Sequence, residues 1–209
     1  MSTQKPDTRS RILEAVLSLV ADDPETGLRM ADIAKRAGIS RQALYLHFAT
    51  RTDLLVATTL YVDHVKDIDA RLAASRAAKS GAERLAAYID AWGNYIPEIY
   101  AIARVLLALK DSGDAAAAAA WDRRMAAMRE GCAAAINTLK SDGLLSPEHP
   151  RGRATDLLWT MLSVRNWEQL TIDCGWSQKA YIANLKNTAR QLFVAAEARQ
   201  LFVAVEEGQ

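Results

Sequence analysis

Apolar residues recur at intervals of three and four along almost the whole chain, which is the period of an amphipathic helix. A first helix is predicted from about residue 7 to 21, where Ile12, Val16 and Leu19 fall on one face. A turn is predicted at 23–27, which contains a proline and a glycine. No stretch alternates with period two for long enough to predict a strand, so we expect an all-α protein.

The stretch 29–51, RMADIAKRAGISRQALYLHFATR, has the spacing of two short helices joined by a tight turn. In the first helix Ile33 and Ala37 lie on one apolar face. Gly38 suits the left-handed backbone conformation that ends a helix. Ser40 is a good N-cap for the second helix, because its hydroxyl can accept a hydrogen bond from a free backbone N–H. The pattern therefore predicts a helix-turn-helix.

The second of these helices has one apolar face and one polar face. Leu44 and Phe48 lie four residues apart on the apolar face. A helix that enters the major groove of DNA needs hydrogen-bonding groups in its first turn, where Arg41 can bind guanine and Gln42 can bind adenine. The side chains predicted on the exposed face are Arg41, Gln42, Tyr45, Leu46 and His47.

Charge supports the same interpretation. Between residues 29 and 51, five Lys or Arg and one Asp give a net charge of +4, whereas the whole chain carries only +1. A local cationic excess is typical of a surface that binds phosphates. A solvated helical pair with scattered charge is the alternative, and the Gly–Ile–Ser turn at the right place favours DNA binding.

These residues resemble the DNA-binding domain of the TetR family of transcriptional regulators. The resemblance covers about residues 8–56. The matching segments are Asp32-Ile33-Ala34, Ala37-Gly38-Ile39-Ser40, Leu44-Tyr45, His47-Phe48 and Arg51-Thr52-Asp53-Leu54-Leu55.

The resemblance implies phosphate contacts from Tyr45, His47, Thr50 and Arg51, and base contacts from the first turn of the recognition helix. Two positions depart from the family pattern. Arg29 stands where Thr or Ser is common, so a helix cap is lost and a cation replaces it. Ala43 stands where Thr is common, so a polar contact is replaced by a methyl group that can touch thymine. The complete set of expected DNA-binding residues is Arg29, Ser40, Arg41, Gln42, Ala43, Tyr45, His47, Thr50 and Arg51.

About nine helices are expected in all, and the resemblance implies the same number, three in a head and six in a body. We expect a DNA-binding domain at 1–51 and a regulatory and dimerisation domain at 52–209. Pro97 is expected to end one helix and to separate it from the next. The helices predicted after the head are 50–72, 82–96, 98–110, 115–141, 152–174 and 177–207.

The C-terminal part contains an internal repeat. The sequence RQLFVA occurs at 190–195 and again at 199–204, nine residues later. Nine helical residues turn the chain by about 180°, so the two copies would point their apolar residues to opposite faces. The second copy therefore either meets a different surface or frays.

Dimerisation is expected because one recognition helix gives limited specificity, and two-fold pairing places two such helices on a palindrome. The last two long helices are the candidates for the interface, as a four-helix bundle with their mates. The alternative for each apolar residue there is the core of the single chain. The residues that supply this surface are Leu157, Leu158, Met161, Leu162, Trp167, Leu185, Leu192 and Phe193.

Aromatic and methionine residues of the body suit an apolar cavity, although the same residues at helical spacing are often plain core. The resemblance implies a small-molecule effector that releases DNA, and we expect it to be apolar or aromatic. No other cofactor is expected. Arg104, Arg165 and Glu168 are candidate polar anchors. The candidate lining residues are Trp92, Tyr95, Tyr100, Trp121, Met125, Met128 and Trp159.

Other classes of protein find little support. There is no Gly-rich phosphate loop, no Gly-x-Ser-x-Gly and no metal-ligand spacing, so we do not expect an enzyme. Cys132 and Cys174 are expected to be buried reduced thiols, which suits a cytoplasmic protein. No apolar run approaches the ~18 residues of a membrane span. A helical adaptor that binds only protein is the remaining alternative, and it leaves the polar face around Arg41 unexplained.

Overall fold

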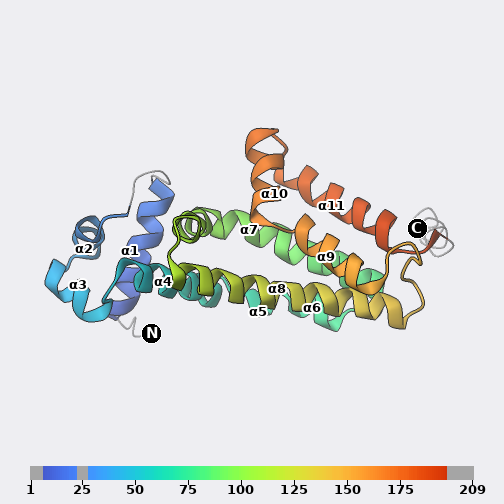
Figure 1. Ribbon diagram of the computed structural model, residues 1–209, viewed down its shortest axis with the longest axis horizontal. Coiled ribbons are helices and arrows are strands. Elements are labelled where there is room, and N and C mark those ends of the chain that lie inside the picture. Colours follow the sequence, from blue (N-terminus) through green and yellow to red (C-terminus); the bar gives the residue numbers. More distant parts are fainter. Residues whose placement is uncertain (1–6, 23–27, 197–209) are drawn as a thin grey trace, which may run out of the picture. The chain divides into compact units, whose positions relative to one another are not determined.

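The computed structural model describes residues 7–22 and 28–196 (Figure 1). All regular structure in this part of the chain is helical, and the only β-type pairing within it is an isolated bridge between Leu145 and Val194. The predicted all-α class is therefore confirmed. The elements are α1 (Thr8–Asp22), α2 (Met30–Ala37), α3 (Arg41–His47), α4 (Arg51–Val65), α5 (Ile68–Arg71), α6 (Ala73–Ala77), α7 (Gly81–Asp111), α8 (Ala115–Ser141), α9 (Arg151–Met161), α10 (Val164–Glu168), the π-helical turn η1 (Gln169–Asp173) and α11 (Gln178–Phe193).

The chain forms two compact units, and the long helices α7 and α8 contribute to both. The first unit comprises 1–66 with 98–123, and the second comprises 67–97 with 124–209. In the first unit α1 packs on α2 and α4, and α2 packs on α3. Its core includes the fully buried side chains of Ile12, Ile33, Leu44, Leu54 and Leu55.

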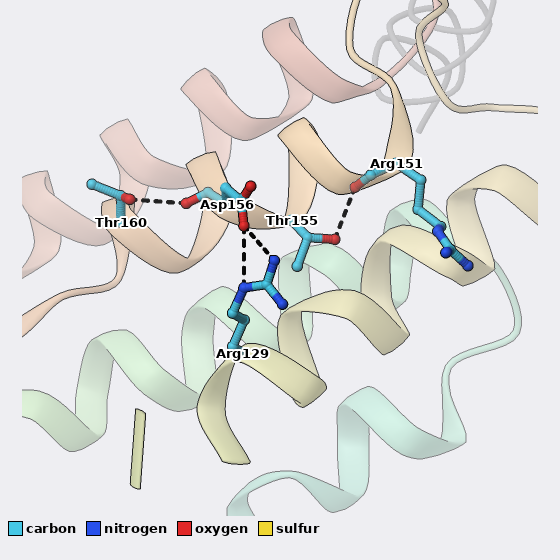
Figure 2. Close-up of polar contacts among 5 residues, drawn as sticks. All are labelled: Arg129, Arg151, Thr155, Asp156 and Thr160. Atoms are coloured by element: carbon cyan, nitrogen blue, oxygen red, sulfur yellow. Dashed lines mark hydrogen bonds and ion pairs between the residues drawn. The ribbon is translucent and has the colours of Figure 1, made fainter. Parts of the chain in front are cut away.

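The second unit has its core among α7, α8, α9 and α11. Tyr88 of α7 is buried, and its hydroxyl donates a 2.8 Å hydrogen bond to the carbonyl of Met128 in α8. A glycine is needed opposite, because a Cβ at Gly131 would lie 2.3 Å from that hydroxyl. On the surface, Arg129 of α8 donates from Nε to Asp156 of α9 at 3.1 Å, as Figure 2 shows. Beside it Thr155 bonds back to the carbonyl of Arg151.

The helix predicted at 50–72 is shorter than expected. It ends at Val65, and Asp67 adopts the left-handed conformation with φ 48°. The Asp67 carboxylate accepts a hydrogen bond from the backbone N–H of Ala70 at 3.0 Å and so caps a new short helix, α5. The prediction of one continuous helix over 50–72 is wrong beyond Val65, because a local side-chain cap competes with helix continuation.

The predicted break at Pro97 is also wrong, since α7 runs through it from Gly81 to Asp111. Proline has no N–H to donate to the carbonyl four residues earlier. That carbonyl belongs to Gly93, and it accepts a 2.6 Å hydrogen bond from Nε2 of Gln178 in α11. The amide is held from its other end, because Trp167 Nε1 donates to Gln178 Oε1 at 2.8 Å. A contact across 85 residues thus satisfies the group that Pro97 leaves unpaired.

The helix predicted at 152–174 is divided into α9, α10 and η1. Ser163 makes the break, because its hydroxyl accepts from the backbone N–H of Asn166 at 3.1 Å and caps α10. The last helix begins after Ser177 as predicted but ends at Phe193. Its end is fixed by the pairing of Val194 with Leu145, so the first RQLFVA copy does not stay helical throughout. The second copy, 199–204, lies outside the described residues.

The two cysteines differ. Cys132 is buried, and burial raises the pKa of its thiol to about 12. Cys174 is exposed, so the prediction of a buried thiol there is wrong. It directly follows the π-helical turn and precedes Gly175, where a left-handed backbone conformation ends the helical segment. Within the residues that the structure describes, no helix is long and apolar enough to cross a membrane, and no three metal-ligating side chains come together.

Candidate nucleic-acid interface

The first helix of the predicted motif, α2, forms because its apolar residues share one face. Ile33, Ala34 and Ala37 are buried against the rest of the first unit. Arg29 occupies the N-cap position with extended backbone and makes no side-chain cap. Its guanidinium is therefore not used to stabilise the helix, as the departure from the family pattern suggested.

The turn between α2 and α3 has the predicted geometry. Gly38 has φ 67° and ψ 38°, the left-handed conformation that a side chain disfavours. The backbone N–H of Ile39 donates to the carbonyl of Ala34 at 3.0 Å and closes the turn. Ser40 then caps α3 by accepting from the backbone N–H of Ala43 at 3.1 Å. These local bonds fix the direction in which α3 leaves α2.

The recognition helix α3 separates its faces sharply. Leu44 and Phe48 point into the core and are almost completely buried. Arg41 lies beside Tyr45 one turn later, with its guanidinium 5.6 Å from the ring centroid and Nη2 3.5 Å from the hydroxyl oxygen. All five residues predicted for the polar face are exposed, namely Arg41, Gln42, Tyr45, Leu46 and His47.

The start of α4 follows shortly after the recognition helix and is capped reciprocally. Thr50 accepts from the backbone N–H of Asp53 at 3.0 Å, and the Asp53 carboxylate accepts from the backbone N–H of Thr50 at 3.1 Å. This capping box orders the segment that carries Arg51. Arg51 is half-buried, and its Nε atom is buried with no hydrogen-bond partner.

One of the five basic residues between 29 and 51 is paired with α1. Arg36 donates to the Asp22 carboxylate at 2.8 Å and also bonds to the hydroxyl of Ser18, both on α1. It therefore ties α2 to α1 and contributes less to the cationic surface than the sequence count suggested. A cation outside the predicted set is better placed, since Arg9 of α1 lies 4.4 Å above the ring of Phe48.

The candidate effector residues do not form one group. Tyr100 and Trp121 belong to the first unit, whereas Trp92, Tyr95, Met125, Met128 and Trp159 belong to the second. In the second unit Trp92 packs against Tyr88 and Tyr95, with ring centroids 6.3 and 5.7 Å apart. An open pocket of about 900 Å³ between α7 and α11 is lined by none of the seven. The assignment of these residues to an effector stays a prediction.

Two of the candidate effector residues each have a buried nitrogen atom that makes no hydrogen bond. The indole Nε1 atoms of Trp92 and Trp159 are buried and lack a hydrogen-bond partner. The candidate anchors Arg104 and Arg165 are exposed and Glu168 is half-exposed. Arg104 stacks near Tyr100, 5.8 Å from the ring centroid.

The residues proposed for dimerisation divide between core and surface. Leu158, Leu162, Trp167, Leu185 and Phe193 are buried within the single chain, as the alternative interpretation held. Leu157, Met161 and Leu192 are half-exposed and are free to contribute to an interface. Helices α9 and α11, which carry these three, pack against each other in the second unit (Figure 1).

A known family model matches most of the predicted DNA-binding domain. The model of the family of bacterial regulatory proteins named after tetR matches residues 12–58. The nucleoid occlusion factor SlmA of Marinobacter nauticus is 37% identical over 57 residues, which are 27% of this chain and 29% of that protein. The curated relatives are thus matched over only about a third of their length.

Solved structures resemble nearly the whole chain in fold. A protein of Saccharomonospora viridis described as a transcriptional regulator in complex with choline has a TM-score of 0.76 and 18% identity, covering 89% of this chain and 97% of that one. A Rhodococcus protein described as a TetR-family transcriptional regulator has a TM-score of 0.66 and 22% identity, covering 88% and 97%. The N-terminal region thus matches the family model of bacterial regulatory proteins of the tetR family, and nearly the whole chain shares the fold of these solved structures.

Proposed function

We propose that this protein binds duplex DNA sequence-specifically and regulates transcription, most simply as a repressor that excludes polymerase from a promoter. The observation that carries the proposal is the exposed polar face of α3, which the Gly38–Ser40 turn holds clear of the core. Arg41 and Gln42 in its first turn are the base-reading residues. Ala43, which is half-exposed, offers a methyl group to the same groove.

Phosphate contacts would flank these base contacts on both sides. Tyr45, His47, Thr50 and Arg51 lie at the end of α3 and the start of α4, and Arg29 lies at the start of α2. The Thr50 hydroxyl accepts within its own capping box, so its proton remains available to a phosphate oxygen. Ser40 contributes mainly by capping α3 and presenting its first turn.

A homodimer would give this head its specificity, because two recognition helices one helical turn apart read a palindrome. We place the interface on α9 and α11, where Leu157, Met161 and Leu192 are half-exposed. Residues 1–51 would then act as the DNA-binding domain and 52–209 as the regulatory and dimerisation domain. We place its action in the cytoplasm.

A small effector in the body would switch DNA binding. A ligand changes affinity for DNA only if it binds the DNA-incompetent conformation more tightly than the competent one. The unpaired indole N–H groups of Trp92 and Trp159 favour a mainly apolar molecule with hydrogen-bond acceptors. The solved relative with choline bound supports the general idea of a small ligand without identifying the one that binds this chain.

The test is selection of duplexes from a random pool by the purified full-length protein, at two salt concentrations. We expect one enriched palindrome whose binding weakens steeply with salt. The matched control is the Arg41→Ala, Gln42→Ala double variant, which should lose the enriched sequence while retaining weak, unselective binding. To remove any ligand that the protein carries, the selection is repeated after unfolding and refolding. If no sequence is enriched in either case, the result would favour a protein-binding adaptor and overturn the proposal.

A further inference from the structure

One apolar side chain of the recognition helix has no role in the fold. Leu46 is 84% exposed, although its neighbours Leu44 and Phe48 are almost completely buried. It lies four residues after Gln42 and three after Ala43, so all three share the face of α3 that points away from the core. The exposed face of α3 is therefore polar in its first turn, at Arg41 and Gln42, and carries an apolar side chain further along, at Leu46.

The chemistry of the major groove limits what such a leucine can contact. Base edges there present hydrogen-bond donors and acceptors to polar side chains, and the C5-methyl group of thymine is the apolar feature among them. From these positions we propose that Leu46 reads a thymine methyl group and so sets a base preference beyond those of Arg41 and Gln42. This inference rests on the proposed function, because it requires α3 to lie in the groove.

Burial of apolar surface supplies the preference. In the free protein the leucine side chain is in water, so packing it against a methyl group removes apolar surface from water on both molecules. Such burial is favourable by ~25 cal/mol per Å². A polar base edge at the same place gains nothing from leucine. The residue therefore discriminates between thymine and the other bases without forming a hydrogen bond.

Replacing thymine by uracil removes only the methyl group, which makes the test selective. In the palindrome enriched by the wild-type protein, each thymine of the half-site is replaced in turn by uracil, and affinity is measured for wild type and Leu46→Ala. We expect one position where uracil weakens the wild type about threefold to tenfold and leaves Leu46→Ala unchanged. Arg41→Ala is the control, in which the uracil effect at that position should persist.

The ways in which this test can fail are distinguishable. Equal uracil effects in wild type and Leu46→Ala would overturn the role of Leu46 while leaving DNA binding intact. A pool with no enriched sequence would overturn both this inference and the proposed function. Because Leu46 is exposed, Leu46→Ala should melt within a few degrees of wild type, and this measurement separates a missing base interaction from a failure to fold.

A second observation concerns Arg9 and is independent of the first. Its guanidinium lies 4.4 Å above the ring of Phe48, the residue that ends the recognition helix. The residue is otherwise exposed, and it stands next in space to the segment that carries His47 and Thr50. The nearby Asp7 carboxylate is occupied as the cap of α1, where it accepts from the backbone N–H of Ser10 at 2.7 Å.

A stacked guanidinium keeps its edge free, so its N–H groups can bind a phosphate while the ring holds its plane. We infer that Arg9 is a phosphate contact that α1 adds to the DNA surface. Arg11, two residues further on, provides a matched control. It lies on another face of the same helix, is half-buried, and its Nη2 atom is 3.4 Å from the Thr8 hydroxyl.

The test compares Arg9→Gln with Arg11→Gln on the selected palindrome and on a scrambled duplex over a range of salt. Arg9→Gln should weaken both duplexes by a similar factor and reduce the salt slope by about one, the value for a single phosphate contact. Arg11→Gln should leave the slope unchanged. Identical slopes for the two variants, with both folded by circular dichroism, would overturn the role of Arg9.

Discussion

The two compact units differ in how their structure is specified. In the first, the path from α2 to α3 is set by neighbouring residues, because Gly38 turns the chain and Ser40 caps the next helix within a few positions. In the second, distant residues also take part, such as Gln178, which supports α7 at Gly93 where the helix continues through Pro97. Local rules therefore suffice where the proposed DNA-binding surface is built, but they are not enough for the second unit.

The units also differ in what they expose. The first unit presents Arg41, Gln42, Tyr45 and His47 to solvent from a helix anchored by one buried face. The second unit hides most of its large side chains, including Tyr88, Tyr95 and Tyr181. Candidate residues for DNA contacts can therefore be recognised by their type and exposure, whereas candidate residues for a small-molecule site have the same types as core residues.

The largest expected loss of stability comes from a substitution on the buried face of α3. Leu44 is fully buried, so Leu44→Ala should cost about 2–5 kcal/mol of folding free energy through reduced burial and a cavity. Chemical denaturation measures this cost, and DNA binding should disappear as the head unfolds. Leu46→Ala is the matched control on the exposed face. Equal stability losses for the two leucines would contradict the assigned faces.

A tightly packed site in the second unit gives the next effect. The Gly131→Ala variant places a Cβ 2.3 Å from the Tyr88 hydroxyl, and overpacking of this kind typically costs about 1–3 kcal/mol. Thermal melting of the variant measures the destabilisation. Two ring carbons of Tyr88 lie 2.8 Å from the same Cβ, so Tyr88→Leu, which removes the ring, should lessen the additional cost of Gly131→Ala. An equal cost of Gly131→Ala in the wild-type and Tyr88→Leu backgrounds would contradict a clash with the tyrosine ring.

The base-reading role of the first unit is tested by Arg41→Ala. The variant should bind its cognate site more weakly by about 1–3 kcal/mol, with relaxed preference at one base pair. The measurement is titration of the selected duplex and its single-base variants. A uniform weakening on every sequence would assign Arg41 to a phosphate instead.

The long-range bond that supports α7 predicts an effect of similar size, confined to one region of the second unit. In Gln178→Leu the Gly93 carbonyl, which Pro97 cannot serve, has no donor, and an unpaired buried acceptor costs about 1–3 kcal/mol. Hydrogen exchange should then increase around residues 93–97 more than in the first unit. Gln191→Leu, an exposed position on the same helix, is the control and should leave exchange there unchanged.

The smallest effect separates phosphate from base contacts. If Tyr45 binds a phosphate through its hydroxyl, Tyr45→Phe weakens all duplexes about equally, by about 0.5–1.5 kcal/mol. Affinities for the selected and scrambled duplexes distinguish the two roles. A weakening confined to one sequence would refute the phosphate role.

Local sequence signals predict one part of this fold and miss another. The all-α class follows from helical periodicity along the chain and the helix-turn-helix follows from Gly38 and Ser40, and the structure confirms both. The family model that matches residues 12–58 agrees with the resemblance seen in the sequence. The helix ends predicted at residues 72 and 207 and the break predicted at Pro97 are wrong, because α4 ends at Val65, α11 ends at Phe193 and α7 continues through Pro97. The end of α4 reflects a local cap by Asp67 that competes with helix continuation, whereas the other two depend on distant partners, the Gln178 side chain and the pairing of Val194 with Leu145.

The candidate sites show the same division. The exposure of Arg41, Gln42, Tyr45 and His47 is predictable, because helical periodicity assigns them to the face opposite Leu44. The position of Arg9 above Phe48 is not, because it depends on how α1 packs against a residue far along the chain. The candidate effector residues are the least determined by sequence, since an aromatic residue in a core and one in a binding cavity share the same pattern.

The most direct test of sequence reading by α3 is the affinity of the full-length protein for its selected palindrome and for a scrambled duplex of equal composition, over a range of salt concentrations. We expect a preference for the palindrome of about 10³-fold or more, and affinities for both duplexes that fall steeply as salt rises. Equal affinities for the two duplexes, or binding that does not change with salt, would contradict the assignment of α3 as a sequence-reading helix.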